Sequence, residues 1–164
     1  MNIIPQKLKT LEEACFDREQ LRNVNKTVVL TNGCFDLLHA GHVMALQQAK
    51  SLGDSLWVAI NSDASVRALK RPNRPIYSEI ERAFLLSALT VVDGIFIFHN
   101  ERLTNEILSF KPDIYVKSGD YTIQQLETNE RHALEKIGAK IIFTPFLSGH
   151  STTSTIQEII SNKL

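Results

Sequence analysis

Two histidines separated by two residues are the side chains of this sequence best suited to chemistry on a phosphate group. His39 and His42 lie in the segment TNGCFDLLHAGH, which directly follows an apolar run at residues 27–30 (TVVL). The second histidine begins a predicted helix, and a helix N-terminus offers free N–H groups and partial positive charge to an anion. Imidazole can donate a hydrogen bond to developing negative charge, and Gly41 leaves space for a nucleotide to approach closely. The segment therefore predicts a phosphate-binding catalytic site, although a loop histidine followed by a helix-capping histidine would give the same pattern.

A hydroxyl-rich segment near the C-terminus is a second candidate phosphate site. Residues 148–155 read SGHSTTST and open a predicted helix that starts at about residue 152. Hydroxyl groups and free backbone N–H groups at a helix start can hold a phosphate. Ordinary N-capping accounts for one serine or threonine at such a position and is the alternative to a phosphate contact.

The elements that must position both segments alternate between strands and helices. Predicted strands are 27–30, 56–60, 95–98, 114–117 and 140–143, and predicted helices are 42–52, 79–89, 105–110, 124–137 and a last one from about 152. Apolar strands that alternate with helices predict an α/β fold, a Rossmann-like doubly wound parallel sheet of five strands with helices on both faces. Such sheets bind ligands at the carboxyl ends of their strands, which is where both segments fall.

The composition of the 164-residue chain is that of a globular protein of one domain. The 18 basic and 18 acidic residues give a net charge of zero, which argues against a broad nucleic-acid or anionic-membrane surface. Cys15 and Cys34 have no metal-binding or redox spacing. No segment is typical of a signal peptide or a membrane span, so the expected location is the cytoplasm.

The two candidate phosphate segments resemble the signatures of a known enzyme superfamily. TNGCFDLLHAGH is similar to the HxGH signature of the nucleotidyltransferases, and HSTTST is similar to their second, ISTT-like signature. The branch that the chain most resembles is the D-glycero-β-D-manno-heptose 1-phosphate adenylyltransferases, through LGDSLWVAINSDASVRALK, RPIYSEIERAFLLSAL, VVDGIFIF and PDIYVKSGDY. In the last stretch Ser118 stands where the family has a glycine. The resemblance implies a nucleotidyltransferase domain at residues 26–164 behind an N-terminal helical extension (1–25). It also implies the stand-alone form of a domain that many bacteria fuse to a sugar kinase.

The resemblance implies a reaction and a set of residues for it. AMP would pass from ATP to a sugar 1-phosphate by in-line attack, giving ADP-heptose and pyrophosphate without a covalent enzyme intermediate. Catalysis is assigned to His39, His42 and Lys70. Nucleotide binding is assigned to Asn32, Gly33, Cys34, Phe35, Gly41, Ser151, Thr152 and Thr153. Substrate binding is assigned to Asp36, Asp63, Arg82, Lys117, Gly119 and Asp120. Mg²⁺ would be carried mainly by the nucleotide phosphates, without a protein-built metal site.

Plainer structural roles stay open for several of these residues. Lys70 belongs to KRPNRP, a loop with two prolines, and is either a mobile phosphate clamp or part of a solvated basic loop. Arg82 could form a surface ion pair, and Asp63 is expected to cap the helix that follows it. Gly119 and Asp120 are also typical of a tight turn.

Two other functions remain as alternatives. Glycerol-3-phosphate cytidylyltransferases, which use CTP, share both signatures, but they carry an arginine before the Ser-Thr-Thr segment where this chain reads PFLSGH. A non-catalytic nucleotide-binding module would not need two histidines aimed at a leaving group. The expected partners are small molecules, a nucleoside triphosphate and a sugar phosphate, with neither nucleic acid nor membrane, and a homodimer is left open.

Overall fold

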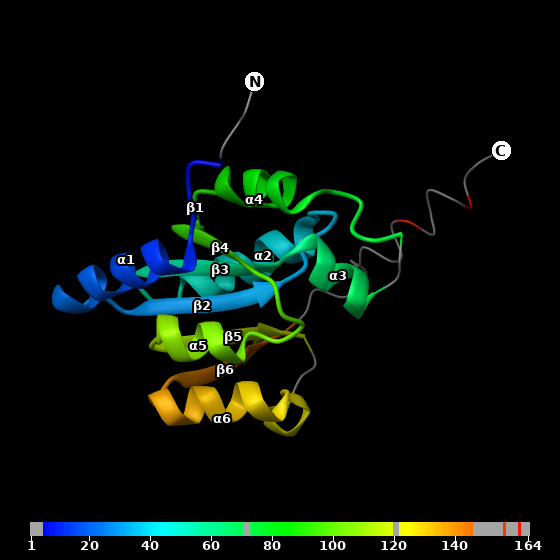
Figure 1. Cartoon of the computed structure of the whole chain (residues 1–164). Helices are drawn as coiled ribbons and strands as arrows, with labels where there is room; N and C mark the ends of the chain where they lie inside the picture. Colours follow the sequence, from blue (N-terminus) through cyan, green and yellow to red (C-terminus); the bar gives the residue numbers. More distant parts are fainter. Residues whose placement is uncertain (1–4, 71–72, 120–121, 146–155, 157–160, 162–164) are drawn as a thin grey trace.

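In the part of the chain that the structure describes, six parallel strands form one sheet in the order β1-β4-β3-β2-β5-β6 (Figure 1). The computed structural model describes residues 5–70, 73–119, 122–145, 156 and 161. The strands are β1 (Leu8–Lys9), β2 (Val28–Gly33), β3 (Ser55–Asn61), β4 (Gly94–Phe98), β5 (Ile114–Ser118) and β6 (Lys140–Thr144). From β2 the chain first adds β3 and β4 on one side and then β5 and β6 on the other, so the strand order reverses beside β2.

The Rossmann-like parallel sheet predicted from the sequence is confirmed, but the predicted number of five strands was wrong. The additional strand, β1, lies at the edge of the sheet and pairs Leu8 with Ile95 and Lys9 with Phe96. Two residues are too few to show the alternation that identifies a strand in a sequence. The helix that follows, α1 (Leu11–Asn23), begins with a capping box between Thr10 and Glu13. The N-terminal extension therefore contributes both a strand and a helix to the fold.

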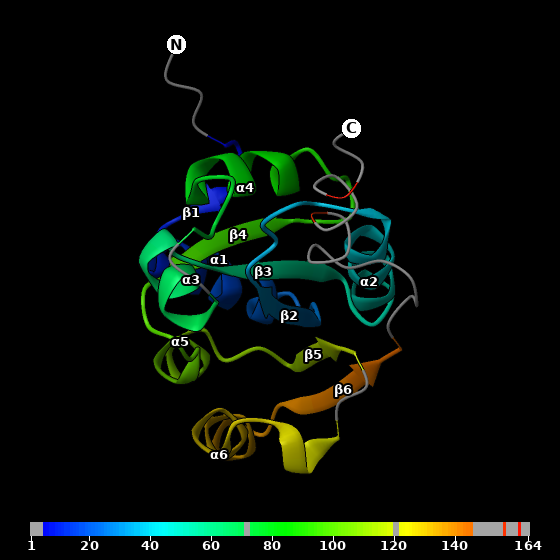
Figure 2. The ribbon, with the colours of Figure 1, turned by 90° about the vertical axis from the view of Figure 1, so that its right-hand side faces the viewer.

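Helices cover both faces of the sheet (Figure 2). Besides α1 they are α2 (Ala40–Lys50), α3 (Asp63–Leu69), α4 (Glu79–Ser87), α5 (Thr104–Phe110) and α6 (Thr128–Ile137), with a short 3-10 turn at Ile123–Gln125. One core cluster joins α1, α5 and α6 to one face, and a second joins α2 and α4 to the other. Of the predicted last helix, from about residue 152, the structure describes only residues 156 and 161, and both are helical. Among the described helices, none has both the length and the apolar character that crossing a membrane requires.

The two core clusters are built by the alternation of side chains along the buried strands. In β3, Trp57 and Ala59 enter the cluster beneath α1 and α5, whereas Leu56, Val58 and Ile60 enter the cluster beneath α2 and α4. Strands of a parallel sheet that is covered on both faces read as continuous apolar runs. This is why the sequence revealed the central strands with nearly their observed bounds.

Three aspartates tie the amino ends of the strands together in the same way. Asp54, Asp93 and Asp113 each stand one residue before a strand, namely β3, β4 and β5. Their carboxylates accept hydrogen bonds from the backbone N–H groups of Thr27 (2.9 Å), Leu56 (2.6 Å) and Val28 (2.7 Å), respectively. They also pair with the side chains of Lys26 (2.9 Å), Lys50 (2.6 Å) and Arg18 (2.7 Å). Each carboxylate therefore joins the start of its own strand to a neighbouring segment and to a cation.

Candidate active site

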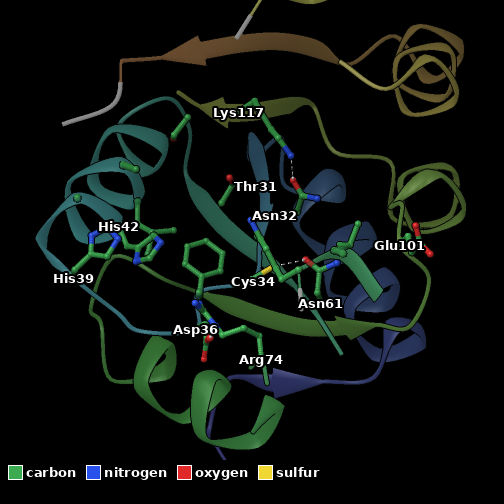
Figure 3. A pocket seen from close by; sticks show the side chains of 18 of the residues that line it. Thr31, Asn32, Cys34, Asp36, His39, His42, Asn61, Arg74, Glu101 and Lys117 are labelled. Carbon is green, nitrogen blue, oxygen red and sulfur yellow. Dashed lines mark hydrogen bonds and ion pairs between the residues drawn. The ribbon is translucent and has the colours of Figure 1, made fainter. Parts of the chain in front are cut away.

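A cavity of about 510 Å³ opens at the carboxyl ends of β2, β3 and β5 (Figure 3). The loop from β2 to α2 and the first turns of α2 form one wall, and the end of α3 together with Arg74 forms another. Glu101 and Arg102, which follow β4, complete the lining with Glu130 of α6. The cavity thus lies where the strand order reverses, which is where sheets of this topology hold their ligands.

His39 and His42 lie at the start of α2 with their rings stacked. His39 is the N-cap residue, and its ring centroid is 3.7 Å from that of His42, with 23° between the two planes. Gly41 is buried between them and lines the cavity. The ring of Phe35 packs at a tilt against His42, with 5.2 Å between the centroids. Two imidazoles therefore share a helix N-terminus, where backbone N–H groups and the helix dipole favour an anion.

The surroundings of His42 favour its neutral form. Burial is the main cause that lowers its pKa from 6.5 to about 4, repulsion from His39 acts in the same direction, and a hydrogen bond with the backbone of Leu37 opposes both. A neutral imidazole still carries one N–H group. At physiological pH His42 is therefore neutral, and its single N–H group can donate either to the backbone of Leu37 or to a phosphate oxygen without bringing a full charge into the cavity.

The low pKa of His42 predicts a loss of stability in mild acid. A histidine in an unfolded chain titrates near pH 6.5, so between that pH and about pH 4 the unfolded state binds a proton that the folded state does not. The free energy of unfolding should therefore fall as the pH is lowered through this window. A His42→Gln variant, which does not titrate, should lose less melting temperature than the wild type over the same range, as measured by calorimetry. Parallel melting-temperature curves for the two proteins would contradict the assignment.

A hydrogen-bond network fixes the side chain of Asn32 at the end of β2. Its Oδ1 accepts bonds from the hydroxyl of Tyr115 (2.8 Å) and from Nζ of Lys117 (2.9 Å). Because a lysine ammonium can only donate, the amide oxygen faces Lys117, and Asn32 lines the cavity beside it (Figure 3). Burial lowers the pKa of Lys117. The site thus contains an amide group whose orientation is set by its neighbours.

Cys34 lines the same wall, but its surroundings do not favour a nucleophile. Burial raises the pKa of its thiol, so the reactive thiolate is disfavoured at neutral pH. Its Sγ lies 3.7 Å from Oδ1 of Asn61, whose Nδ2 donates to Oγ of Ser65 (2.9 Å). Cys34 therefore contributes packing and hydrogen bonding to the cavity wall.

Asp36 is buried, and its carboxylate is occupied by the chain itself. Oδ1 accepts hydrogen bonds from the backbone N–H groups of Ile76 (2.7 Å) and Tyr77 (3.1 Å), and Oδ2 accepts one from Nε of Arg74. Only 2% of the residue is exposed. Asp36, assigned by resemblance to substrate binding, is thus placed where it joins the loop after β2 to residues 74–77.

Arg82 is fully buried and donates to four oxygen atoms of the protein. Its guanidinium binds the carbonyl groups of Cys34 (2.6 Å), Asn61 (2.7 Å) and Tyr77 (3.1 Å) and Oδ1 of Asp63 (2.9 Å). The residue is 0% exposed, so the interpretation of a surface ion pair was wrong, and the side chain does not line the cavity. Arg82 instead holds together the loop after β2, the end of β3 and the start of α4.

The helix after β3 is capped by a different residue from the one expected. Oγ of Ser62 accepts a hydrogen bond from the backbone N–H of Ser65 (3.2 Å), which makes Ser62 the N-cap of α3. Asp63 is the first residue inside the helix, and its carboxylate pairs with Arg82. The expectation that Asp63 caps this helix was therefore wrong.

The structure brings most of the residues assigned from the sequence to one cavity. Those that line it are Asn32, Gly33, Cys34, Phe35, Asp36, His39, Gly41, His42, Lys70 and Lys117. Asp63, Arg82 and Gly119 do not line it, and Asp120, Ser151, Thr152 and Thr153 lie outside the described residues. Sequence reasoning missed Asn61, Arg74, Glu101, Arg102, Ser118 and Glu130. Several of these residues could have been predicted to lie at the site because they stand at, or just after, the carboxyl end of a strand.

Comparison with known proteins gives matches over nearly the whole chain. The family model described as Cytidylyltransferase-like matches residues 30–158. The bifunctional protein HldE of Syntrophotalea carbinolica is 45% identical over 150 residues, covering 87% of this chain and 30% of that protein. HldE of Desulfatibacillum aliphaticivorans is 44% identical over 153 residues, covering 93% of this chain and 31% of that protein. The chain thus spans about 30% of the length of these curated relatives.

Solved structures with a similar fold are also found. The lipopolysaccharide core biosynthesis protein from Thermoplasma volcanium GSS1 is similar with a TM-score of 0.59 and 28% identity, over 74% of this chain and 97% of that one. The pantoate-beta-alanine ligase from Francisella tularensis has a TM-score of 0.61 over 95% of this chain and 79% of that one. Its sequence identity is 16%, so this second likeness is one of fold alone.

Proposed function

Because the chain belongs to the cytidylyltransferase-like family, we propose that it transfers a nucleoside monophosphate from a nucleoside triphosphate to a phosphorylated small molecule and releases pyrophosphate. The observation that carries this proposal is the stacked pair of His39 and His42 at the start of α2, on the wall of a cavity of about 510 Å³. Donors placed there can stabilise the charge that develops on the α-phosphate and on the leaving pyrophosphate. The cavity has the volume typical of small-molecule sites.

In the proposed reaction, an oxygen of the acceptor phosphate attacks the α-phosphorus of the nucleotide in line. The bond from that phosphorus to the bridging oxygen of the pyrophosphate breaks, and pyrophosphate leaves with the electron pair. The acceptor phosphate is already a competent nucleophile, so the protein contributes orientation and stabilisation of charge. His39, His42 and the N-terminus of α2 would contact the nucleotide phosphates, and Lys70 would add a positive charge from the end of α3.

Mg²⁺ is proposed to enter the site with the nucleotide. In the described part of the chain, no group of three or more histidine, cysteine, aspartate or glutamate side chains could hold a metal ion. Mg²⁺ commonly keeps several waters and binds substrate phosphates with few protein ligands. The hydroxyl groups of Ser151, Thr152 and Thr153 are proposed to hold the β- and γ-phosphates.

We further propose ATP and D-glycero-β-D-manno-heptose 1-phosphate as the substrates, which gives ADP-heptose for lipopolysaccharide synthesis. The resemblance of VKSGDY and RPIYSEIERA to the heptose branch supports this choice, as do the similarities to HldE proteins and to a lipopolysaccharide core biosynthesis protein. The cavity also offers hydrogen-bond donors in Asn32 and Lys117 and acceptors in Glu101 and Glu130. Such a mixture suits the hydroxyl groups of a sugar.

The proposal is tested by measuring pyrophosphate release with ATP or CTP and a panel of acceptors, namely the heptose 1-phosphate, other sugar 1-phosphates and glycerol 3-phosphate. We expect kcat/KM to be highest for ATP with the heptose 1-phosphate, by about tenfold or more over the other pairs. A preference for CTP with glycerol 3-phosphate would overturn the choice of branch and keep the reaction class. If no pair releases pyrophosphate although calorimetry shows nucleotide binding, the chain is a binding module and not a transferase.

A further inference from the structure

We propose that Arg74 binds a phosphate group in this site and that Asp36 is the positioning residue that aims it. The inference rests on the proposed function and extends it to two residues. The role of each residue follows from which atoms of the Asp36 carboxylate and of the Arg74 guanidinium are already hydrogen-bonded at the wall of the cavity.

Asp36 has the contacts of an anchor. Its Oδ1 accepts the backbone N–H groups of Ile76 (2.7 Å) and Tyr77 (3.1 Å), while its Oδ2 accepts Nε of Arg74. These contacts span 38 to 41 residues of sequence and hold residues 74–77 against the loop that leads to His39. A buried carboxylate with three donors around it is well placed to fix other groups and poorly placed to receive a substrate.

Arg74 has the contacts of a partly used donor. Its side chain is 16% exposed and lines the cavity (Figure 3). The guanidinium binds Asp36 through Nε, and within the described part of the chain no hydrogen bond engages Nη1 or Nη2. A guanidinium fork held along one edge still presents N–H donors along the other, in a geometry that matches phosphate oxygens.

The other arginine–aspartate pairs show that this placement is particular to Arg74. Among the described residues, Arg18 pairs with Asp113 and Arg82 pairs with Asp63, and both of these arginines are almost fully buried, at 1% and 0% exposed. Neither lines the cavity, whereas Arg74 does. Asp113 stands just before β5 and pairs with Arg18 of α1, so this pair lies at the amino ends of the strands, opposite the site. It has the same chemistry as the pair of Arg74 and Asp36 and therefore supplies a matched control.

Either the acceptor phosphate or the phosphates of the nucleotide could be the target of Arg74 in the proposed reaction. The experiment separates them by measuring the affinity for pyrophosphate and for ATP by calorimetry, with Mg²⁺ present, and the KM of each substrate in turnover. The proteins compared are the full chain and its Arg74→Ala, Arg74→Lys, Asp36→Asn and Asp113→Asn variants. Calorimetry measures binding without turnover and therefore tests the role of Arg74 even if the proposed reaction does not occur. Failure of the proposed reaction itself would show as a wild type that releases no pyrophosphate.

Arg74→Ala is expected to weaken the phosphate contact about tenfold to a hundredfold, the effect of losing hydrogen bonds to a charged group. If the nucleotide phosphates are the target, the affinities for pyrophosphate and ATP fall by that factor. If the acceptor phosphate is the target, the acceptor KM rises instead and the pyrophosphate affinity is unchanged. Arg74→Lys should recover only part of the loss, because lysine cannot bind Asp36 and present a fork at once. Values within twofold of the wild type for both affinities and both KM values would overturn the proposal, as would a wild type that binds neither pyrophosphate nor ATP.

Asp36→Asn tests the positioning role. It should worsen the same affinity or KM as Arg74→Ala does, by a smaller factor. The double variant should show the loss of Arg74→Ala alone, because both changes act on one contact. A lower melting temperature with an unchanged parameter would show that Asp36 serves only the fold. Asp113→Asn should lower the melting temperature and leave every substrate constant as it is. An equal loss of affinity in Asp113→Asn would mean that any weakening of the fold weakens binding, which overturns the assignment.

Discussion

Replacing His39 or His42 with alanine is expected to lower kcat by about 10²- to 10³-fold while leaving the fold intact. Removal of one preorganised donor to charge in a transition state costs about 3–4 kcal/mol. The two rings are stacked 3.7 Å apart at the first turn of α2, so each alanine variant removes a donor that the helix start had already placed. The pKa of His42, lowered to about 4 by burial, keeps that side chain neutral near pH 7.

The measurement is kcat for pyrophosphate release at saturating substrates, together with the melting temperature of each variant. His99→Ala and His132→Ala are matched controls, because both residues are exposed and neither lines the cavity. These two variants should turn over at the wild-type rate. Near-wild-type turnover in His39→Ala and His42→Ala would leave the pair with a structural role only.

Replacing Arg82 with alanine is expected to lower the free energy of unfolding by about 3–5 kcal/mol, the usual cost of removing one partner of a buried ion pair. The variant leaves the carboxylate of Asp63 without its cation and removes the donor from the carbonyl groups of Cys34, Asn61 and Tyr77. Buried acceptors that lose their donors account for much of this cost.

Urea unfolding gives the free energy directly, and Arg22→Ala is the matched control. Arg22 pairs with Glu19 at the surface, with about half of each side chain exposed. Exposed pairs of this kind contribute less than about 1 kcal/mol. A change below about 1 kcal/mol in Arg82→Ala as well would contradict the structural role assigned to Arg82 here.

The parts of the fold that could be predicted are those whose signal is local in the sequence. The central strands were found because a sheet covered on both faces requires continuous apolar runs such as LWVAI in β3. The loop with His39 and His42 was found because it follows the first of those runs directly. The stacking of the two rings could not be read from their spacing, since it depends on backbone angles at the helix start.

What could not be predicted depends on partners far away along the chain. Arg82 donates to a carbonyl group 48 residues earlier in the chain, and Asp36 accepts a hydrogen bond from Arg74, which lies 38 residues later. Every residue has a carbonyl group, so no letter in the sequence marks the ones that Arg82 binds. Arg74 was missed for the same reason, because its role follows from Asp36 and not from its neighbours in KRPNRP.

The three aspartates before β3, β4 and β5 have a consequence for how such a protein can change over evolution. They hold the strands in register at their amino ends, on the side of the sheet opposite the cavity. Exposed side chains beyond the carboxyl ends that make none of the contacts described for Arg82, Asp36 and Asn32, such as Glu101 and Arg102, can therefore vary without disturbing strand alignment. A library that randomises Glu101 and Arg102 for new acceptors should accordingly retain folded members at high frequency, whereas one that randomises Asp54, Asp93 and Asp113 should lose them. Substrate specificity can thus change through exposed side chains at the carboxyl ends of the strands, while the aspartates at the amino ends keep the strands aligned.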